Sequence, residues 1–404
     1  MARPLSVAII GAGMGGLASA AALRRVGVEV TVYEQATQFS RLGAGIQIGC
    51  NAMKVLRGLG LETKLRQQSF YPRSWNNRDW RTGKVKFDMV FGEAAERKFG
   101  APYLLAHRGD LHAALASAVP PQCIRLGHRL VGLDPTNDGI RLTFAGGATA
   151  LADAVLGADG VHSAVKDILF GASPLNFTGR IAYRTTFPAA LLNGHTIDDC
   201  TKWWGEDRHI VIYYVKPDRS EIYFVTSQPE PGFRIESWSA KGDVNELRKA
   251  FEGFDGQVEH VLAACPDVHK WALVDREPLE RWTDGNVTLL GDACHPMLPF
   301  AAQGAAQAIE DGVTLTACLQ KYDDIPEALA HYQALRLPRT AYVQSLAANN
   351  KIRYHLPDGP EQVARDAKMA AGGTDWSFKA MEWIFGHDPA AAVETGNLGL
   401  PPPA

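Results

Sequence analysis

The pattern of apolar and polar residues begins with a strand, a helix and a second strand. Residues Leu5 to Ile10 form a short apolar run of strand length, and the Ala- and Leu-rich segment from Leu17 to Val26 has helical character. A second apolar run, Val28 to Tyr33, is again of strand length. This order is typical of a parallel β-α-β unit, so the pattern predicts an α/β fold.

The loop between this strand and this helix is rich in glycine, Gly11-Ala-Gly13-Met-Gly15-Gly16, and the second strand ends at Glu34. Gly11 permits a tight turn, Gly13 lets the backbone approach a pyrophosphate, and Gly16 allows the helix to pack closely on the strands. Phosphates would then lie at the helix N-terminus, where free N–H groups and the helix dipole favour negative charge. Glu34 can accept hydrogen bonds from an adenosine ribose. The motif predicts a dinucleotide site, and at this point FAD and NAD both remain open.

Further along the chain, the pattern predicts that a second domain is inserted into the dinucleotide-binding one. From Ile181 to about Glu277, aromatic runs such as Lys202-Trp-Trp and His209-Ile-Val-Ile-Tyr213 are typical of strands in a larger sheet. A helical region extends from Ile325 to about Asn350. We therefore divide the chain into the first part of the dinucleotide domain at 1–180 (with a strand insert at about 70–106), a sheet domain at 181–277, the second part of the dinucleotide domain at 278–350, and a C-terminal helical segment with a proline-rich tail at 351–404. The tail from Gly399 is expected to be extended and disordered.

Composition favours an ordinary globular protein of the cytoplasm. Of the 404 residues, 46% are hydrophobic and 21% are charged, and the net charge of −3 gives no reason to expect nucleic acid or an anionic membrane surface. The six cysteines are scattered without a C-x-x-C pair, which favours a reducing compartment over a disulfide framework. No apolar run has the length of a membrane span. The apolar N-terminus could imitate a signal peptide, but its glycine motif argues against one.

Two further motifs lead to a family. Gly157-Ala-Asp159-Gly160-Val-His162-Ser163 follows a predicted buried strand, and Leu290-Gly291-Asp292-Ala-Cys-His295-Pro-Met-Leu-Pro299 follows another. Together with the N-terminal glycines and Glu34, in this order and spacing, they resemble the group A FAD-dependent aromatic hydroxylases, the family of para-hydroxybenzoate and salicylate hydroxylases. The resemblance extends over about residues 5 to 350.

Within this family the chain is most similar to the 6-hydroxynicotinate 3-monooxygenase-like proteins. The similarity rests on four stretches: Arg41-Leu-Gly-Ala-Gly-Ile46, His107-Arg-Gly-Asp-Leu-His112, Lys202-Trp-Trp-Gly-Glu-Asp-Arg-His209 and Ala302-Gln-Gly-Ala305. The chain also departs from the family pattern. Lys166 stands where an arginine is frequent, Ala302 and Ala306 replace a usual glycine and asparagine, and Gln47 and Phe300 stand where histidines are expected in the hydroxynicotinate branch. The last departure leaves the exact substrate open.

The resemblance implies a Rossmann-like FAD-binding domain with an inserted mixed β-sheet substrate domain and C-terminal helices. It implies bound FAD, with NADH or NADPH and O₂ as co-substrates. The reaction would hydroxylate a hydroxylated aromatic acid, such as a hydroxypyridine carboxylate or a hydroxybenzoate, with or without loss of the carboxyl group, through a C4a-hydroperoxyflavin. The residues that would bind the cofactor are Gly11, Gly13, Gly16, Glu34, Gln35, Gly45, Arg108, Asp159, Asp292, Pro299, Gln303 and Gly304. For Arg108, a surface pair with Asp110 is an alternative.

Candidate catalytic and substrate-binding residues lie mainly in the inserted sheet. On the predicted strand from His209 to Tyr213, alternate side chains share one face, so both could point into a pocket above the flavin ring. His209 is the better candidate base by its ordinary pKa, although either residue could simply pack. The resemblance implies substrate contacts by Gln47, Cys200, His209, Tyr213 and Phe300. Cys294 and His295 have no partnering set of ligands, so no metal site is predicted.

Two other classes of function remain open from the sequence. One is a flavoprotein oxidase or reductase that acts on a small organic substrate without inserting oxygen. The other is a flavin-binding protein with a structural or regulatory role. The motif that begins at Gly157 and the aromatic second domain favour the hydroxylase. The sequence leaves open the choice between NADH and NADPH. It also leaves open whether the protein forms a homodimer.

Overall fold

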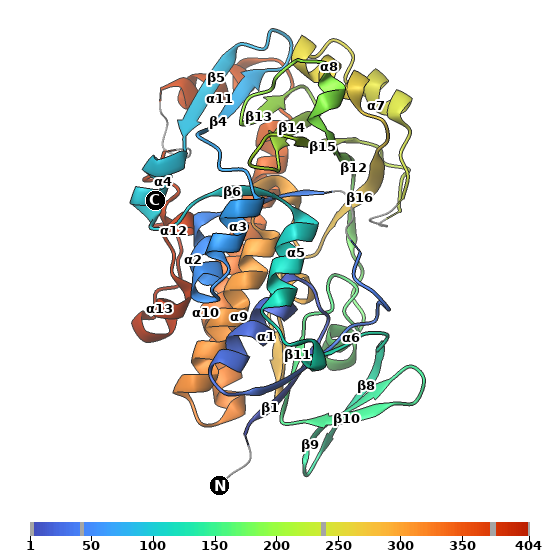
Figure 1. The fold of residues 1–404 in the computed structure, drawn as a ribbon, viewed down its shortest axis with the longest axis vertical. Coiled ribbons are helices and arrows are strands. Elements are labelled where there is room, and N and C mark those ends of the chain that lie inside the picture. Colours follow the sequence, from blue (N-terminus) through green and yellow to red (C-terminus); the bar gives the residue numbers. More distant parts are fainter. Residues whose placement is uncertain (1–3, 41–43, 236–239, 372–376, 403–404) are drawn as a thin grey trace.

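The computed structural model describes residues 4–40, 44–235, 240–371 and 377–402 (Figure 1). Residues 41–43 of the stretch Arg41-Leu-Gly-Ala-Gly-Ile46 lie outside this part of the chain. The fold is a mixture of α and β elements, with a six-stranded and a seven-stranded sheet as its main layers. In Figure 1 the strands β4, β5 and β13 lie at the upper end of the molecule and the small sheet β8–β10 lies at the lower end. The α/β fold class predicted from the sequence is confirmed.

The six-stranded sheet contains the β-α-β unit. Its strands, in spatial order, are β17 (Thr283–Asp284), β18 (Val287–Leu289), β11 (Ala154–Gly157), β1 (Ser6–Ile10), β2 (Glu29–Tyr33) and β7 (Ile124–Arg125). The pairs from β18 through β7 are parallel. Helix α1 (Met14–Arg25) begins three residues earlier than the predicted Leu17, because the glycine-rich loop itself supplies the first helical turn.

The seven-stranded sheet carries the aromatic runs. Its strands, in spatial order, are β16 (His269–Asp275), β12 (Asn176–Pro188), β15 (Glu221–Pro229), β14 (His209–Tyr214), β13 (Cys200–Trp204), β4 (Ser74–Asp79) and β5 (Val85–Val90). Strands β4 and β5 come from the predicted insert at about 70–106 and pair beside β13, so this insert extends the second sheet. The limits of the four predicted domains stay predictions.

Two small sheets complete the strand structure. One contains β8 (Leu130–Thr136), β9 (Gly139–Phe144) and β10 (Thr149–Ala152), and the other pairs β3 (Gly45–Ile48) with β6 (Leu104–His107). The β3–β6 pair brings Gly45 opposite His107, so the glycine-dense loop after β2 lies beside the start of helix α5 (Arg108–Ser117).

Two long helices, α9 (Gly304–Lys321) and α10 (Ile325–Tyr354), pack against each other, and α9 also packs on α1 (Figure 1). The other helices are α2 (Cys50–Gly58), α3 (Glu62–Gln68), α4 (Gly92–Phe99), α6 (Ala164–Phe170), α7 (Val244–Ala250), α8 (Gly256–Ala264), α11 (Pro360–Ala370), α12 (Glu382–Phe385) and α13 (Pro389–Thr395). Within the described ranges, no helix has the length and apolar character needed to cross a membrane.

A buried cluster of charges joins α9, α10 and the C-terminal segment. Glu310 on α9 accepts hydrogen bonds from Arg336 Nη1 (2.6 Å) and Arg339 Nε (2.8 Å), and all three side chains are inaccessible to solvent or nearly so. The two guanidinium groups hold the pKa of Glu310 well below its usual range despite burial. Arg339 also donates to the backbone carbonyls of Trp383 and Gly399.

Residues 399–402 contain neither helix nor strand, as the prediction of an extended tail requires, but the hydrogen bond from Arg339 contradicts the predicted disorder at Gly399. The carbonyl oxygen of Gly399 is fixed because the buried guanidinium of Arg339 needs acceptors beyond Glu310. Pro401 and Pro402 continue along a cavity that is described below. Residues 403 and 404 lie outside the described part of the chain.

Candidate active site

The loop between β1 and α1 is open on the side where a pyrophosphate would lie. A Cβ atom on Gly13 would meet no other atom within 4 Å, and no side chain caps α1 at this residue. Gly11 has a φ of +103°, and a Cβ atom there would lie 2.4 Å from the carbonyl oxygen of Ala158. A Cβ atom on Gly16 would lie 2.1 Å from the carbonyl oxygen of Gly11. The loop thus requires glycine at its turn and offers an uncapped helix N-terminus to an anion.

Glu34 closes this loop at the end of β2. Its two carboxylate oxygens accept hydrogen bonds from the backbone N–H groups of Ala12 and Ala36, each at 2.8 Å. Each oxygen keeps a second lone pair, so the carboxylate can still accept hydrogen bonds from ribose hydroxyls. Gln35 follows in an exposed position. These residues fit the adenosine and pyrophosphate of a dinucleotide.

Arg108 and Asp292 are two charged side chains that interact with each other. The two side chains attract each other electrostatically and both are accessible to solvent. Nevertheless, the surrounding protein raises the pKa of Asp292 by desolvation. Access to water and desolvation occur together when a side chain lines a deep recess. An arginine and an aspartate in such a recess suit phosphate and hydroxyl groups, respectively.

Asp159 fixes the start of α6. Its carboxylate accepts hydrogen bonds from the Ser163 hydroxyl and from the backbone N–H of Val165 (3.1 Å). These contacts hold the turn at the C-terminal end of β11, next to the glycine-rich loop. A contact between Asp159 and a cofactor stays a prediction.

The N-terminus of α9 is a second uncapped helix end. Pro299 begins the short 3-10 helix Pro299–Ala301, and Ala302 follows in the left-handed region with a φ of +52°. Gln303 and Gly304 then start α9, which has neither a side-chain cap nor an acidic residue in its first turn. The Gln303 side chain accepts a hydrogen bond from Asn51 Nδ2 at 2.9 Å. This fixed helix end can donate N–H groups to a negatively charged edge of a ligand.

Gly45 packs directly against two tyrosines of the seven-stranded sheet. A Cβ atom on Gly45 would lie 2.4 Å from Cδ1 of Tyr223 and 2.8 Å from the hydroxyl oxygen of Tyr213. Both tyrosines are buried. The FAD-side loop and the candidate catalytic strand β14 are therefore in contact at this glycine.

We expect Gly45→Ala to lower the free energy of unfolding by about 1–3 kcal/mol, because the added methyl group overpacks a buried contact. We also expect the purified variant to hold less flavin per chain. Thermal unfolding and the flavin absorbance relative to protein measure both effects. Gly256→Ala is the control, because a Cβ atom at Gly256 meets nothing within 4 Å. Unchanged stability and flavin content in the Gly45 variant would show that the tyrosines can move aside.

His209 is the first member of a chain of hydrogen bonds that ends at a carbonyl group. His209 Nδ1 lies 2.7 Å from His355 Nε2, and His355 Nδ1 contacts the Lys351 carbonyl oxygen. The carbonyl can only accept, so His355 carries its proton on Nδ1 and accepts on Nε2 when neutral. His209 then donates from Nδ1, which leaves its Nε2 as a hydrogen-bond acceptor.

Both histidines of this chain are neutral over the physiological range. Burial lowers the pKa of His355 to about 3 and the pKa of His209 well below its ordinary value. His209 in the folded protein therefore lacks the ordinary histidine pKa on which its prediction as a base rests. A neutral His209 can still accept a hydrogen bond from a phenol-like hydroxyl and orient it.

Gln47 forms hydrogen bonds with two tyrosines, Tyr103 and Tyr213. Tyr103 donates to Gln47 Oε1 at 2.6 Å, and Gln47 is also hydrogen-bonded to Tyr213. Cys200 lies opposite Tyr213 in the β13–β14 register. Burial raises the pKa of the Cys200 thiol to about 12, so this residue is an uncharged thiol.

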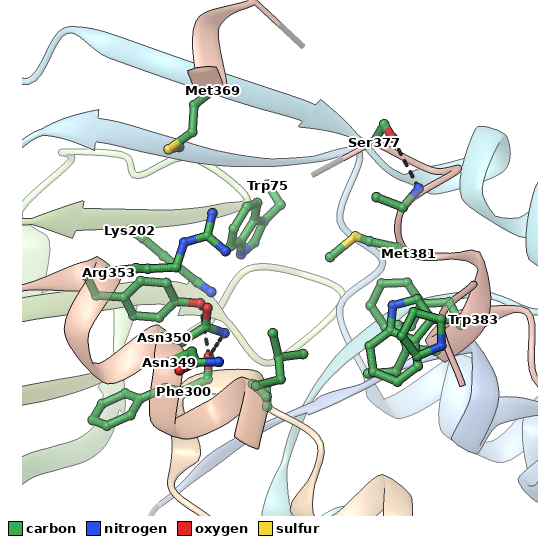
Figure 2. A pocket seen from close by; sticks show the side chains of 18 of the residues that line it. Trp75, Lys202, Phe300, Asn349, Asn350, Arg353, Met369, Ser377, Met381 and Trp383 are labelled. Atoms are coloured by element: carbon green, nitrogen blue, oxygen red, sulfur yellow. Dashed lines mark hydrogen bonds between the residues drawn. The ribbon is translucent and has the colours of Figure 1, made fainter. Parts of the chain in front are cut away.

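A cavity of about 1060 Å³ opens beside these residues. Gln47 and Phe300 line it, whereas Cys200, His209 and Tyr213 lie behind its lining. Figure 2 shows Trp75, Lys202, Phe300 and Asn350 on one side of the cavity and Met381 and Trp383 on the other. The second wall also includes Phe385, Pro401 and Pro402.

None of the site residues predicted from the sequence lies on this second wall, which the C-terminal segment supplies. The apolar run Trp383-Ile384-Phe385 was the available signal, because several large apolar residues in a short segment indicate burial. In the ranges that the structure describes, no group of three or more His, Cys, Asp or Glu side chains could hold a metal ion.

Comparison with known proteins decides the family. Residues 4–346 match the family described as FAD binding domain. The chain belongs to this FAD-binding family. It is 42% identical over 348 residues to the 6-hydroxynicotinate 3-monooxygenase of Bordetella bronchiseptica, with 85% of this chain and 91% of the relative covered. It is 38% identical over 390 residues to the 3-amino-4-hydroxybenzoate 2-monooxygenase of Streptomyces cremeus, with 95% of each chain covered.

A solved structure supports the same grouping. A salicylate hydroxylase in a substrate complex superimposes with a TM-score of 0.81 at 26% identity, over 99% of each chain. The protein is therefore an FAD-dependent aromatic hydroxylase that uses NAD(P)H and O₂ as co-substrates. The predicted family, enzyme class and cofactors are confirmed. Bound FAD supplies the electron transfer and oxygen activation, while the roles of individual site residues stay predictions.

Proposed function

We propose that this enzyme hydroxylates a hydroxylated aromatic acid, in the class of the hydroxybenzoates and hydroxypyridine carboxylates. The observation that carries the proposal is the charge of the cavity next to Gln47 and Phe300. Its lining contains aromatic and apolar side chains and five basic residues, and none of the described lining residues is acidic. The basic residues are Lys202, Arg353, Arg365, Lys368 and Lys379. Such a cavity favours a flat ring that carries a negative charge.

We assign separate tasks to the residues around the ring. His209 lies behind Phe300, with 5.5 Å between the two ring centres. Its Nε2 atom accepts a hydrogen bond from the ring hydroxyl once the Phe300 ring moves aside for the substrate, and this hydrogen bond increases electron density on the ring. Gln47 lines the cavity and orients the ring, and its hydrogen bond with Tyr213 holds the Gln47 side chain in place. The N-terminus of α9 and the recess at Arg108 and Asp292 hold FAD. In each case support comes from the geometry described above and from the family.

We infer that Gln47 and Phe300 narrow the choice of substrate within this class. Gln47 can donate and accept but cannot carry a charge, and Phe300 offers no hydrogen bond at all from its side chain. The ring position that faces Phe300 must therefore carry an apolar substituent or none. The side chains of Gln47 and Phe300 thus limit which ring acids bind productively.

The test is a scan of purified protein with NADH and with NADPH against hydroxybenzoates and hydroxypyridine carboxylates. Flavin reduction is followed without oxygen, and the product and peroxide are measured after oxygen is admitted. We expect at least one ring acid to accelerate flavin reduction and to leave with one added oxygen atom. Reduction of the flavin by an organic substrate alone, or peroxide as the sole oxygen product, would instead indicate an oxidase or a reductase.

A further inference from the structure

Lys202 is a buried lysine whose ammonium group reaches the cavity. It lies on β13 with 8% of its surface exposed, and it lines the cavity together with Gln47 and Phe300. Figure 2 shows its side chain beside Trp75 and Asn350 on one side of the cavity. The other four basic lining residues are more exposed than Lys202.

The ammonium group of Lys202 has no anionic partner within the described part of the chain. Its Nζ atom lies 4.1 Å from the centre of the Trp75 ring and 5.6 Å from that of Tyr354, which are cation–π contacts. The other two buried lysines are paired: Lys166 Nζ lies 2.6 Å from Asp167, and Lys270 Nζ lies 2.8 Å from Glu230.

An unpaired buried charge is costly, so proteins normally neutralise it or supply a counter-ion. Two aromatic faces compensate only part of that cost. Because the described lining contains no acidic side chain, the counter-ion is not supplied by the cavity wall. A ligand with a carboxylate would supply it.

We propose that Lys202 binds the carboxylate of the substrate and thereby selects aromatic acids over their uncharged analogues. This inference rests on the proposed function, because it assigns a binding partner to the acid group of that substrate. Trp75 and Tyr354 hold the ammonium group from the sides. The direction left open to it is the cavity that Gln47 and Phe300 also line.

The ionisation of Lys202 adds a pH dependence. Burial lowers the pKa of its ammonium group to about 8. The titratable groups that face it are the Cys200 thiol on the same strand, His209 on β14 and the Tyr354 hydroxyl on α10, and all three are uncharged near neutral pH. The protonated form binds a carboxylate, so affinity for the acid falls as the pH rises above about 8.

The experiment compares binding of matched acid and amide probes to the FAD-loaded protein. The pairs are 4-hydroxybenzoate with 4-hydroxybenzamide and 6-hydroxynicotinate with 6-hydroxynicotinamide, and the Kd is read from the flavin absorbance change. We expect Lys202→Met to weaken the acids about 10- to 100-fold and the amides less than about threefold, because only the acids lose a charged hydrogen bond. Lys202→Arg should retain part of the preference. Lys84→Met is the control: it removes an exposed lysine that does not line the cavity and should change each Kd less than about threefold.

Thermal unfolding separates a binding lysine from a structural one. Without ligand, Lys202→Met should raise Tm, because methionine removes an uncompensated buried charge at similar length. Equal weakening of acid and amide, an unchanged Kd for the acids, or a lowered Tm would each overturn the proposal. The proposed function fails separately: wild-type protein would then bind acids selectively through Lys202 and yet release no oxygenated product from any of them.

Discussion

Replacing Arg339 by methionine is expected to lower the free energy of unfolding by about 3–5 kcal/mol, because it leaves the buried carboxylate of Glu310 with one guanidinium partner fewer. Glu310 and Arg339 are both inaccessible to solvent, so water cannot take over the lost hydrogen bonds. The carbonyl groups of Trp383 and Gly399 lose their donor in the same step. Denaturant unfolding followed by tryptophan fluorescence measures the change.

Lys321→Met is the matched control for this variant. Lys321 also holds the C-terminal segment, through a 2.8 Å hydrogen bond from its Nζ atom to the Val393 carbonyl, but its side chain is 35% exposed. We expect this control to lose less than about 1 kcal/mol. If the Arg339 variant lost no more than the control, the buried cluster would contribute nothing beyond an ordinary surface pair.

Replacing His209 by asparagine is expected to lower kcat for ring hydroxylation by about 10²- to 10⁴-fold, because the variant lacks the Nε2 acceptor for the ring hydroxyl. FAD content should not change, since His209 belongs to β14 and lies away from the glycine-rich loop. Product formation and peroxide are measured together, and we expect the ratio of peroxide to product to rise. A variant that retains the wild-type kcat would remove His209 from the mechanism.

Two substitutions of His355 test whether the hydrogen-bond chain sets the tautomer of His209. Glutamine can accept from His209 and donate to the Lys351 carbonyl, whereas phenylalanine can do neither. We expect His355→Gln to stay within about tenfold of the wild-type kcat and His355→Phe to lose a large part of the His209 effect. Equal activity of the two variants would show that His355 only packs.

Much of the fold was predictable because it depends on local patterns. The strand, the glycine turn and the helix at residues 5–26 follow from short-range periodicity and from the conformational freedom of glycine, so only the start of α1 was misplaced. His209 and Tyr213 were correctly placed on one face of a strand, since alternation along a strand needs no knowledge of its neighbours.

The parts that could not be predicted depend on contacts between distant segments. Nothing near Lys202 in the sequence shows that Trp75 and Tyr354 lie beside it, because β4 and the end of α10 approach it only in the folded protein. Likewise, the pKa of His209 is lowered by burial and by His355, which lies far away along the chain. For the C-terminal wall, the apolar run Trp383-Ile384-Phe385 indicates burial, but its place beside the cavity depends on the distant Arg339.

The attachment of residues 383–399 to Arg339 has a consequence for how the protein is made. The segment that forms one wall of the cavity is synthesised after all the strands of the two large sheets. Until it emerges from the ribosome, the nascent chain can assemble the β-α-β unit but leaves Arg339 without its final acceptors and the cavity without that wall. Competence for substrate binding is therefore acquired only after residues 383–399 have been synthesised, when the FAD-binding strands have already had time to pair.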